Sequence, residues 1–302
     1  MTNILVSIII PVYNRAEILS TTLDSVVKQT YQNIEIIVID DGSEEDIKSV
    51  IKSLNDKRLS YYKLPHVNAN HARNYGIKQA KGDYIAMLDA DDLWMPNHIE
   101  DCLELVTKTD ADGLYGSIIV KNIFSEDEDH IIINGPREDE SMINYLLRTG
   151  FGAQTSTLFL TSKSVKNILW DETLYRHQDY DFVVRYSKKY RFAVKKEPTV
   201  IYRKYNQSSS IDITSCIKVI EANEDEIEPI TYINYNYNML NLALNQRADN
   251  YLIDYYRKES TRYKEFLTFT QFLQIYMPQS EEQIETLRQE YISYIVDIEV
   301  EL

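Results

Sequence analysis

Three short polar runs hold the side chains of this chain that could do chemistry. They are Pro11–Arg15 (PVYNR), Asp40–Ser43 (DDGS) and Asp89–Asp92 (DADD), and each follows a run of apolar residues. The third run places three carboxylates in four positions, which costs stability unless a cation or a hydrogen-bond donor neutralises them. Oxygen ligands suit Mg²⁺ and Mn²⁺, which also bind phosphate oxygens and water. These residue types therefore favour a divalent-metal site for a phosphorylated substrate.

Helix capping is the structural alternative for some of these side chains. Asp41 or Ser43 could cap a following helix, and Asp92 could cap a helix whose first turn contains Pro96. Capping needs one side chain, however, and does not explain three carboxylates in the third run. We therefore favour the metal site there and leave Ser43 open between capping and binding.

The apolar runs before these residues predict strands that alternate with helices. Such alternation is typical of βαβ units with a mostly parallel sheet. Open sheets of this kind bind ligands outside the carboxyl ends of their strands, so the three polar runs are expected to meet at one edge. The expected strands are Ile4–Ile10, Ile34–Ile39, Leu59–Leu64, Tyr84–Leu88, 115–124, 155–160 and 191–203, with helices after the first two strands and at 69–80, 139–149, 179–189 and from 213 onward.

Composition and charge exclude several classes of protein. The chain has 302 residues, 44% of them hydrophobic, which is enough for one large domain or one domain with an appendage. Its net charge of −15 argues against nucleic acid as the main ligand. Cys102 and Cys216 form no disulfide framework or metal-ligand spacing, which is consistent with a reducing compartment. With no apolar run long enough to span a bilayer, the chain is expected to be cytoplasmic.

Four segments in this order resemble the inverting family 2 glycosyltransferases of the GT-A fold. The segments are Val6–Asn14 (VSIIIPVYN), Glu35–Ser43 (EIIVIDDGS), Ala72–Gly76 (ARNYG) and Gly82–Asp92 (GDYIAMLDADD). The resemblance covers about residues 4–210 and implies an α/β fold with a Rossmann-like central sheet flanked by helices. Residues 1–210 would form the transferase domain, with 1–112 binding the nucleotide-sugar and 113–210 forming the acceptor side. Residues 211–302 would be a helical C-terminal region.

The resemblance also implies roles for individual residues on the donor side. Asp91, the second acid of the D-x-D motif, would hold Mn²⁺ or Mg²⁺ on the donor diphosphate, and Asp89 would lie near the ribose or sugar. Asp41 would meet the nucleobase. Arg73 lies beside the nucleotide or forms a structural pair with an aspartate, and both readings stay open. The expected nucleotide-sugar-binding residues are Pro11, Val12, Tyr13, Asn14, Asp41, Arg73, Asp89, Ala90 and Asp91.

On the acceptor side the resemblance makes Asp179 the catalytic base. The preceding segment Trp170–Leu174 (WDETL) is similar to a family stretch and supports this register. A helix N-terminus favours the carboxylate form, so Asp179 is expected to be ionised at neutral pH, whereas Asp181 is expected to pair with Arg185. The chain departs from the family at two positions, with Gln178 in place of a Glu and Tyr205 in place of a His. Thr155, Gln178 and Arg203 are the expected acceptor-side residues.

Together these residues predict a transferase that moves one sugar from a nucleotide-sugar, expected to be a UDP-sugar, to a hydroxyl of a glycan or lipid-linked glycan. Peripheral attachment to the inner face of the membrane would bring it to such an acceptor. The alternatives are a nucleotide-sugar-binding scaffold without catalysis and a sugar-nucleotide pyrophosphorylase. A pyrophosphorylase should carry a glycine-rich loop where this chain has PVYN. The tyrosines of the C-terminal helices indicate a core or contacts between copies in a homo-oligomer.

Overall fold

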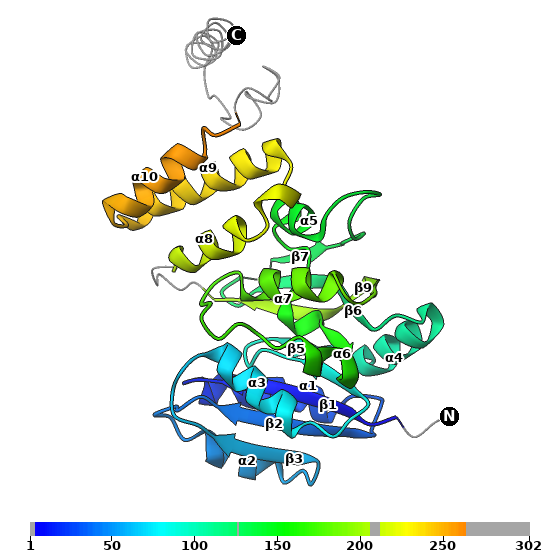
Figure 1. Cartoon of the computed structure of the whole chain (residues 1–302). Helices are drawn as coiled ribbons and strands as arrows, with labels where there is room; N and C mark the ends of the chain where they lie inside the picture. The colour runs from blue at the N-terminus through cyan, green and yellow to red at the C-terminus, as the bar shows by residue number, and fades with distance from the viewer. Residues whose placement is uncertain (1–3, 126, 206–211, 264–302) are drawn as a thin grey trace, which may run out of the picture. The chain divides into compact units, whose positions relative to one another are not determined.

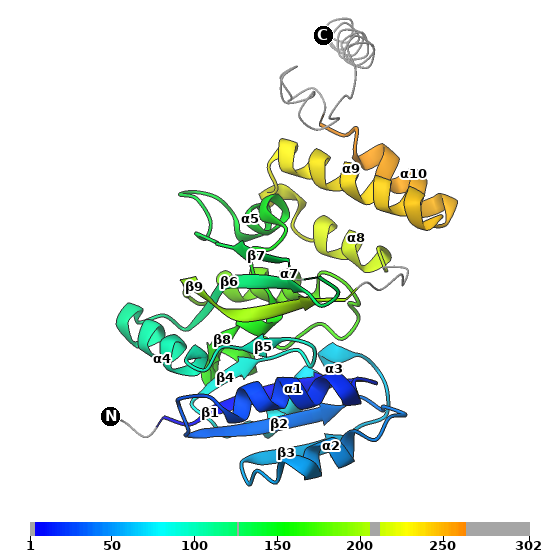
Figure 2. The ribbon, with the colours of Figure 1, turned by 180° about the vertical axis from the view of Figure 1, so that it is seen from behind.

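The computed structural model describes residues 4–125, 127–205 and 212–263, and the chain divides into two compact units (Figures 1 and 2). The first unit comprises residues up to 138 together with 151–209, and the second comprises 139–150 and the residues from 210. The first unit contains β1 (Val6–Val12), α1 (Ala16–Val27), β2 (Ile34–Asp40), α2 (Ile47–Leu54), β3 (Leu59–Lys63), α3 (Ala69–Gln79), β4 (Tyr84–Met87), β5 (Leu93–Trp94), α4 (His98–Thr109), β6 (Gly113–Asn122), β7 (Glu128–Ile131), η1 (Thr155–Thr157), β8 (Phe159–Thr161), α6 (Ser162–Asn167), α7 (Gln178–Ser187) and β9 (Phe192–Lys204).

The described strands of the first unit form one sheet in the order β3-β2-β1-β4-β8-β6-β9-β5, with β7 paired to β6. β3, β2, β1 and β4 are parallel, as the alternating pattern predicts. The second half of the sheet is mixed, because β8 is antiparallel to both β4 and β6. The chain adds β2 and β3 on one side of β1 and then crosses back to place β4 on the other. This reversal creates the switch point at which α/β sheets bind ligands.

Alternate residues of β1 face two different helices. Ile8 and Ile10 belong to the buried cluster that also contains Leu19 and Leu23 of α1, whereas Ile9 faces α3, where a Cβ on Gly76 would come within 2.6 Å of its side chain. Gly76 therefore allows α3 to pack closely on β1 and β2. Figures 1 and 2 show α1 and α3 on opposite faces of these strands. With both faces covered, the strands read as continuous apolar runs.

The second unit is helical, as expected for the C-terminal region. It contains α5 (Met142–Thr149), α8 (Thr214–Glu221), η2 (Glu224–Glu226), α9 (Pro229–Gln246) and α10 (Asn250–Glu259). Pro229 occupies the first turn of α9, where its missing N–H costs nothing. Tyr232 and Tyr256 are buried, and the Tyr232 hydroxyl donates to Glu259 at 2.7 Å, whereas Tyr251 is 71% exposed. The core reading therefore applies to Tyr232 and Tyr256. The expected helical region beyond residue 263 lies outside the described residues.

Some local expectations were wrong. The strand expected at 155–160 begins only at Phe159, because 155–157 form the η1 turn, where Leu158 N donates to Thr155 O. Pro96 precedes α4, whose N-cap is Asn97, rather than lying in its first turn. α2 is capped by Asp46, which accepts a hydrogen bond from Ser49 N, and the Ser43 hydroxyl instead accepts from Asn14 N. Strands β5 and β7 and helix α6 were not expected.

Candidate active site

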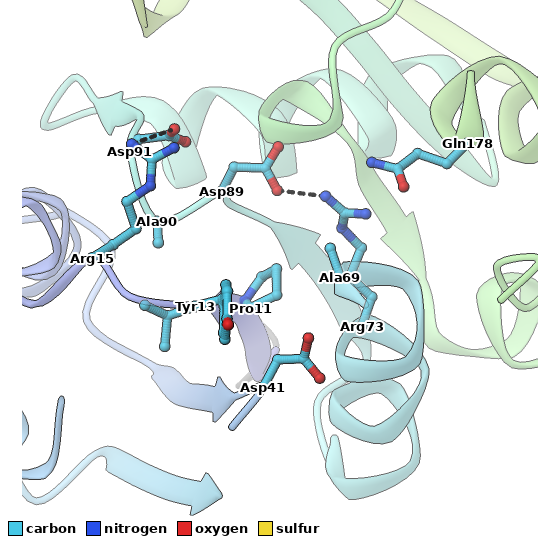
Figure 3. Close-up of a pocket in the computed structure, with 11 residues that line it drawn as sticks. Pro11, Tyr13, Arg15, Asp41, Ala69, Arg73, Asp89, Ala90, Asp91 and Gln178 are labelled. Atoms are coloured by element: carbon cyan, nitrogen blue, oxygen red, sulfur yellow. Dashed lines mark hydrogen bonds and ion pairs between the residues drawn. The ribbon is translucent and has the colours of Figure 1, made fainter. Parts of the chain in front are cut away.

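A pocket of about 370 Å³ lies at the carboxyl ends of β1, β2 and β4 (Figure 3). These strand ends carry the three polar runs of the sequence, so the expectation that the runs meet at one edge is confirmed. The pocket is lined by Pro11, Val12, Tyr13, Arg15, Asp41, Ala69, Arg73, Asp89, Ala90, Asp91 and Gln178. Eight of the nine residues expected to bind the nucleotide-sugar are in this set, and Asn14 is the exception. Gln178 reaches the pocket from the expected acceptor side.

Asp41 is buried at the bottom of the view in Figure 3 and is held by the loop before α3. Its Oδ1 accepts from Val67 N at 3.0 Å, and its Oδ2 lies 2.8 Å from His66 Nδ1. The loop can approach so closely because Gly42 has φ +79°, and a Cβ there would lie 2.6 Å from His66 N. These contacts replace the helix-capping role considered for Asp41. Its carboxylate keeps further lone pairs that can accept from a ligand.

Tyr13 and Asn14 follow β1 and act in different ways. The Tyr13 ring is stacked on the His66 ring with centroids 4.1 Å apart, and its side chain lines the pocket. Asn14 adopts φ 47°, and its Oδ1 accepts from Glu44 N at 2.8 Å. The Asn14 side chain thus ties the end of β1 to the loop after β2. The structure places it in support of the pocket wall rather than among the lining residues.

Asp89 and Arg73 form an ion pair within the pocket. Arg73 Nη2 donates to Asp89 Oδ1 at 2.7 Å, and the Arg73 side chain is 3% exposed. The guanidinium also lies over the Trp170 ring, 4.7 Å from its centroid. Figure 3 shows the two side chains pointing toward one another, with Gln178 beyond Arg73. Both readings of Arg73 therefore hold in part, since it pairs with an aspartate and also lines the pocket.

Asp91 has the properties of a single carboxylate ligand for a hard cation. Its side chain is 32% exposed, and its Oδ2 lies 3.6 Å from Arg15 Nη1. Burial and the neighbouring Asp89 raise the pKa of Asp91, while Arg15 opposes this shift. A cation would relieve the same repulsion. No group of three His, Cys, Asp or Glu side chains with metal-binding geometry occurs in the described residues. A partly exposed carboxylate such as Asp91 fits a cation that also binds phosphate oxygens and water.

Asp92 and Arg203 fix the loop that carries Asp91. Asp92 is 3% exposed and accepts from Ser156 Oγ at 2.5 Å and from Arg203 N at 3.2 Å. Arg203 Nε donates to Asp91 O, and its Nη2 donates to Thr22 Oγ1 at 2.9 Å. Burial, Asp89 and Asp91 raise the pKa of Asp92 well above its usual range. Arg203, expected on the acceptor side, thus holds this loop to α1.

Thr155 and Tyr205 lie outside the set of residues that line the pocket. Thr155 is 5% exposed and is not among the residues that line the pocket. The ring of Tyr205 lies 5.6 Å from the Arg15 guanidinium carbon and 6.0 Å from that of Arg203. At the position where the resembling family has a His, this chain therefore has an aromatic ring within about 6 Å of two cations.

Asp179 lies in the first turn of α7, one residue after Gln178. The N-cap of this helix is His177, with φ 55°, so Asp179 is not the cap. Asp179 is half-buried, and burial raises its pKa to about 6, although the Tyr180 N–H and Arg73 both act to lower it. It is therefore mostly ionised at neutral pH, as expected, but with a pKa that is raised rather than held low. The expected pair of Asp181 and Arg185 is present at 2.5 Å.

Arg15 lines the pocket and His66 contacts two of its residues, but the sequence analysis assigned neither residue a role of its own. Arg15 closes the run PVYNR, and its proximity to the acidic run could have been inferred from their common strand-end position. His66 follows β3, and its contacts with Asp41 and Tyr13 cross 25 and more residues of sequence. No local pattern marks such a residue.

The sequence matches the model of glycosyl transferase family 2 over residues 7–168. The chain belongs to this family. It is 33% identical over 213 residues to the amylovoran biosynthesis glycosyltransferase AmsB of Erwinia amylovora, covering 67% of this chain and 70% of that protein. It is 34% identical over 166 residues to an Escherichia coli protein named UDP-Glc:alpha-D-GlcNAc-diphosphoundecaprenol beta-1,3-glucosyltransferase WfaP, covering 54% of this chain and 63% of that one. The predicted family is confirmed. The alternative that the chain is a sugar-nucleotide pyrophosphorylase is therefore not supported.

Solved structures confirm the GT-A fold. The Staphylococcus aureus TarS fragment 1–349 in complex with UDP-GlcNAc matches with a TM-score of 0.58 at 17% identity, covering 95% of this chain and 80% of that one. The mannosyltransferase of Pyrobaculum calidifontis, in complex with GDP-Man and Mn²⁺, matches with a TM-score of 0.51 at 12% identity, covering 96% and 80%. Among the described helices of the transferase, none has the length and apolar character needed to cross a membrane.

Proposed function

We propose that this transferase moves a hexose from a UDP-sugar to a hydroxyl of a lipid-linked glycan, with inversion at the anomeric carbon. One observation carries the proposal: Gln178 lines the pocket at the switch point, and Asp179, the next residue of α7, has a pKa of about 6 to which Arg73 and Asp89 of that pocket contribute. A carboxylate with that pKa can accept a proton at neutral pH. It lies close to, but separate from, the carboxylates that would meet the donor.

In this mechanism Asp179 accepts the proton of the acceptor hydroxyl while the hydroxyl oxygen forms a bond to the anomeric carbon of the donor sugar. The bond between that carbon and the diphosphate oxygen breaks in the same displacement, and the nucleoside diphosphate departs. Asp91 would hold Mn²⁺ or Mg²⁺, and such a metal supplies Lewis-acid stabilisation of the charge on the leaving diphosphate. Arg15 adds positive charge 3.6 Å from Asp91. The pocket otherwise contributes by aligning the two substrates.

The relatives support the choice of donor and acceptor. The E. coli relative is named for UDP-Glc and for an acceptor sugar on diphosphoundecaprenol, and the TarS complexes contain UDP or UDP-GlcNAc. Amylovoran biosynthesis is the role named for the Erwinia relative. We carry the UDP-sugar and the lipid-diphosphate acceptor to this chain on that basis. Cys102 and Cys216 are buried as thiols, which agrees with the cytoplasmic location proposed for it.

Direct transfer tests this proposal. The full chain is incubated with Mn²⁺, UDP-glucose or UDP-GlcNAc, and GlcNAc-diphospholipid, and the acceptor is analysed by mass spectrometry. We expect a product larger than the acceptor by one sugar residue and a β-linkage when the donor is an α-linked UDP-sugar. Retention of the α-configuration would contradict inversion. Transfer from GDP-mannose but from neither UDP-sugar would contradict the proposed donor.

The pH dependence of the rate tests the assignment of the base. Because burial raises the pKa of Asp179 to about 6, we expect kcat to fall about tenfold for each pH unit below 6. If the base were an aspartate exposed to solvent, kcat would not begin to fall until the pH reached about 4. The measurement is kcat between pH 5 and 8 with saturating substrates. A rate that is constant down to pH 5 would assign the proton transfer to another group.

Asp41 provides a separate test of the donor side. We expect its carboxylate to accept a hydrogen bond from a base N–H, so Asp41→Ala should weaken UDP binding by about ten- to a hundredfold, the effect of roughly 1.5–3 kcal/mol for a hydrogen bond to a charged group. Isothermal calorimetry with UDP measures the change. The matched control is Asp24→Ala, which removes an exposed carboxylate of α1 that pairs with Lys28. Equal UDP affinity in the two variants would limit Asp41 to holding the 66–67 loop.

A further inference from the structure

Asn70 connects two parts of the site through one side chain. It is fully buried in α3, and its Oδ1 accepts from Arg73 Nη1 at 2.9 Å. Its Nδ2 donates to Asp171 O at 2.8 Å and to Leu174 O at 3.0 Å. The orientation of the amide follows from its partners, because a flipped amide would place N–H groups against the guanidinium and an oxygen against two carbonyls. Both the oxygen and the nitrogen of the Asn70 amide are therefore hydrogen-bonded.

The contact at the Oδ1 end matters because Arg73 has few other constraints. Asp89 binds its Nη2 at 2.7 Å, and the ring of Trp170 supports one face of the guanidinium. Within the described chain, the buried Nε of Arg73 has no hydrogen-bond partner. Asn70 and Asp89 thus hold different nitrogens of one guanidinium. The loss of either contact would leave the cation less well placed.

The contacts at the Nδ2 end reach the segment that leads into α7. Two other asparagines also bind this segment: Asn68 Nδ2 donates to Glu172 O at 2.7 Å, and Asn74 exchanges hydrogen bonds with the backbone N–H and carbonyl of Trp170 at 2.9 Å. The segment is therefore anchored at neighbouring points without Asn70. This arrangement provides a matched comparison, because Asn74 anchors the segment whereas Asn70 anchors it and also binds Arg73.

Resting on the proposed function, we propose that Asn70 is a positioning residue of the transferase, which holds Arg73 between the donor carboxylate Asp89 and the base Asp179. Asn70 itself contacts neither substrate nor base in this scheme. It acts by fixing where the guanidinium lies and where the segment before α7 runs. α3 would thereby link the donor and acceptor sides of the site.

The consequence for the base follows from the groups that face it. These include Arg73 of α3, Asp89 after β4, Tyr202 of β9 and the Tyr180 N–H of α7. Arg73 and the N–H lower the pKa of Asp179, while burial and Asp89 raise it. If Asn70 no longer holds Arg73, the compensating charge is less well placed and the pKa of Asp179 should rise.

The test compares Asn70→Ala with Asn74→Ala. For Asn70→Ala we expect kcat at pH 7 to fall on the order of tenfold or more, its acidic limb to move to higher pH, and the Kd for UDP to stay within about twofold. Asn74→Ala should lower the melting temperature by a similar amount while keeping the wild-type pH profile. Asn70→Ser, which leaves a smaller gap, serves as a second variant if alanine prevents folding. Identical pH profiles for all of these proteins would overturn the proposal and leave Asn70 a structural residue.

A second measurement determines the pKa of Asp179 without an activity assay. Because the pKa of Asp179 in the folded protein lies above its ordinary value, its contribution to stability is fully present below pH 4 and is lost as pH rises through about 6. The difference in melting temperature between wild type and Asp179→Asn, followed with pH, gives this midpoint. The same difference measured in Asn70→Ala should show a higher midpoint. If the midpoint is higher in Asn70→Ala but neither the wild type nor any variant transfers sugar, the proposed function is contradicted and the effect of Asn70 on Asp179 stands. If the wild type transfers sugar normally but the midpoint is unchanged in Asn70→Ala, only the effect of Asn70 on Asp179 is contradicted.

Discussion

Asp179→Asn is expected to abolish sugar transfer while leaving the affinity for UDP unchanged. The amide has nearly the same shape as the carboxylate but cannot accept a proton from the acceptor hydroxyl. General-base catalysis contributes roughly 10²- to 10⁴-fold to a rate, so the loss should be of that order. Removing a buried charge with a pKa of about 6 should also make the folded protein more stable at pH 8. Single-turnover transfer, UDP calorimetry and thermal unfolding measure the three effects.

Asp181→Asn is the matched control for this prediction. Asp181 lies two residues later in the same helical turn. Both of its carboxylate oxygens accept from Arg185 Nε, and its Oδ2 also accepts from Arg185 Nη2 at 2.5 Å. Its loss should lower stability by about 0.3–0.5 kcal/mol, typical of a half-exposed pair at this spacing, and should leave transfer nearly intact. A near-normal rate for Asp179→Asn, or a large loss for Asp181→Asn, would reverse the assignment. Loss of UDP binding in Asp179→Asn would place Asp179 on the donor side.

The pKa of Asp179 shows where reasoning from the sequence stopped. The first turn of a helix is a favourable place for a carboxylate, and on that basis the sequence predicts an easily ionised acid. In the folded chain the burial of this side chain outweighs both the helix N–H groups and Arg73. Burial depends on segments that come together only in the tertiary structure. A local pattern therefore located the residue but could not give the direction of its pKa shift.

The parallel half of the fold could be predicted because its signals are local. The apolar runs and the polar runs that follow them lie within a few residues of one another. Eight of the residues expected to bind the nucleotide-sugar line one pocket. The contacts of Arg203 were not predicted, for the opposite reason. Its partners Thr21 and Thr22 lie more than 180 residues away in sequence, so nothing near Arg203 indicates that it holds the loop of Asp91 to α1.

The contacts of α3 show the same limit. Asn70 and Asn74 of α3 and its N-cap Asn68 resemble ordinary polar residues of a helix, yet each binds backbone groups of the 170–174 segment, about 100 residues later. The sequence located both segments as family motifs but gave no reason for the asparagines. Buried amides need partners at both ends, and only the folded chain identifies those partners. The sequence alone can thus identify the motif residues, whereas the contacts that support them are known only from the folded structure.

Asp91→Asn is expected to remove turnover without lowering stability. Burial and Asp89 raise the pKa of Asp91, so its charge destabilises the folded state at neutral pH, and the amide relieves that repulsion. The carboxylate is nevertheless the residue proposed to hold the divalent cation, and loss of Lewis-acid assistance worth several kcal/mol should lower kcat by a hundredfold or more. Transfer assays and thermal unfolding at pH 7.5 measure the two effects. A fall in both would indicate a structural defect rather than loss of a metal ligand.

The role of the metal can be separated from catalysis by measuring UDP binding with and without Mn²⁺. In the wild type, Mn²⁺ should increase the thermal stabilisation given by UDP, because a ligand that binds only the folded state stabilises it in proportion to the logarithm of its concentration over Kd. Asp91→Asn should show the same stabilisation by UDP whether or not Mn²⁺ is added. Asp24→Asn, an exposed change on α1, should behave as wild type. Wild-type transfer that continues undiminished in EDTA, or a Mn²⁺ effect that survives in Asp91→Asn, would show that Asp91 is not the ligand of a required metal.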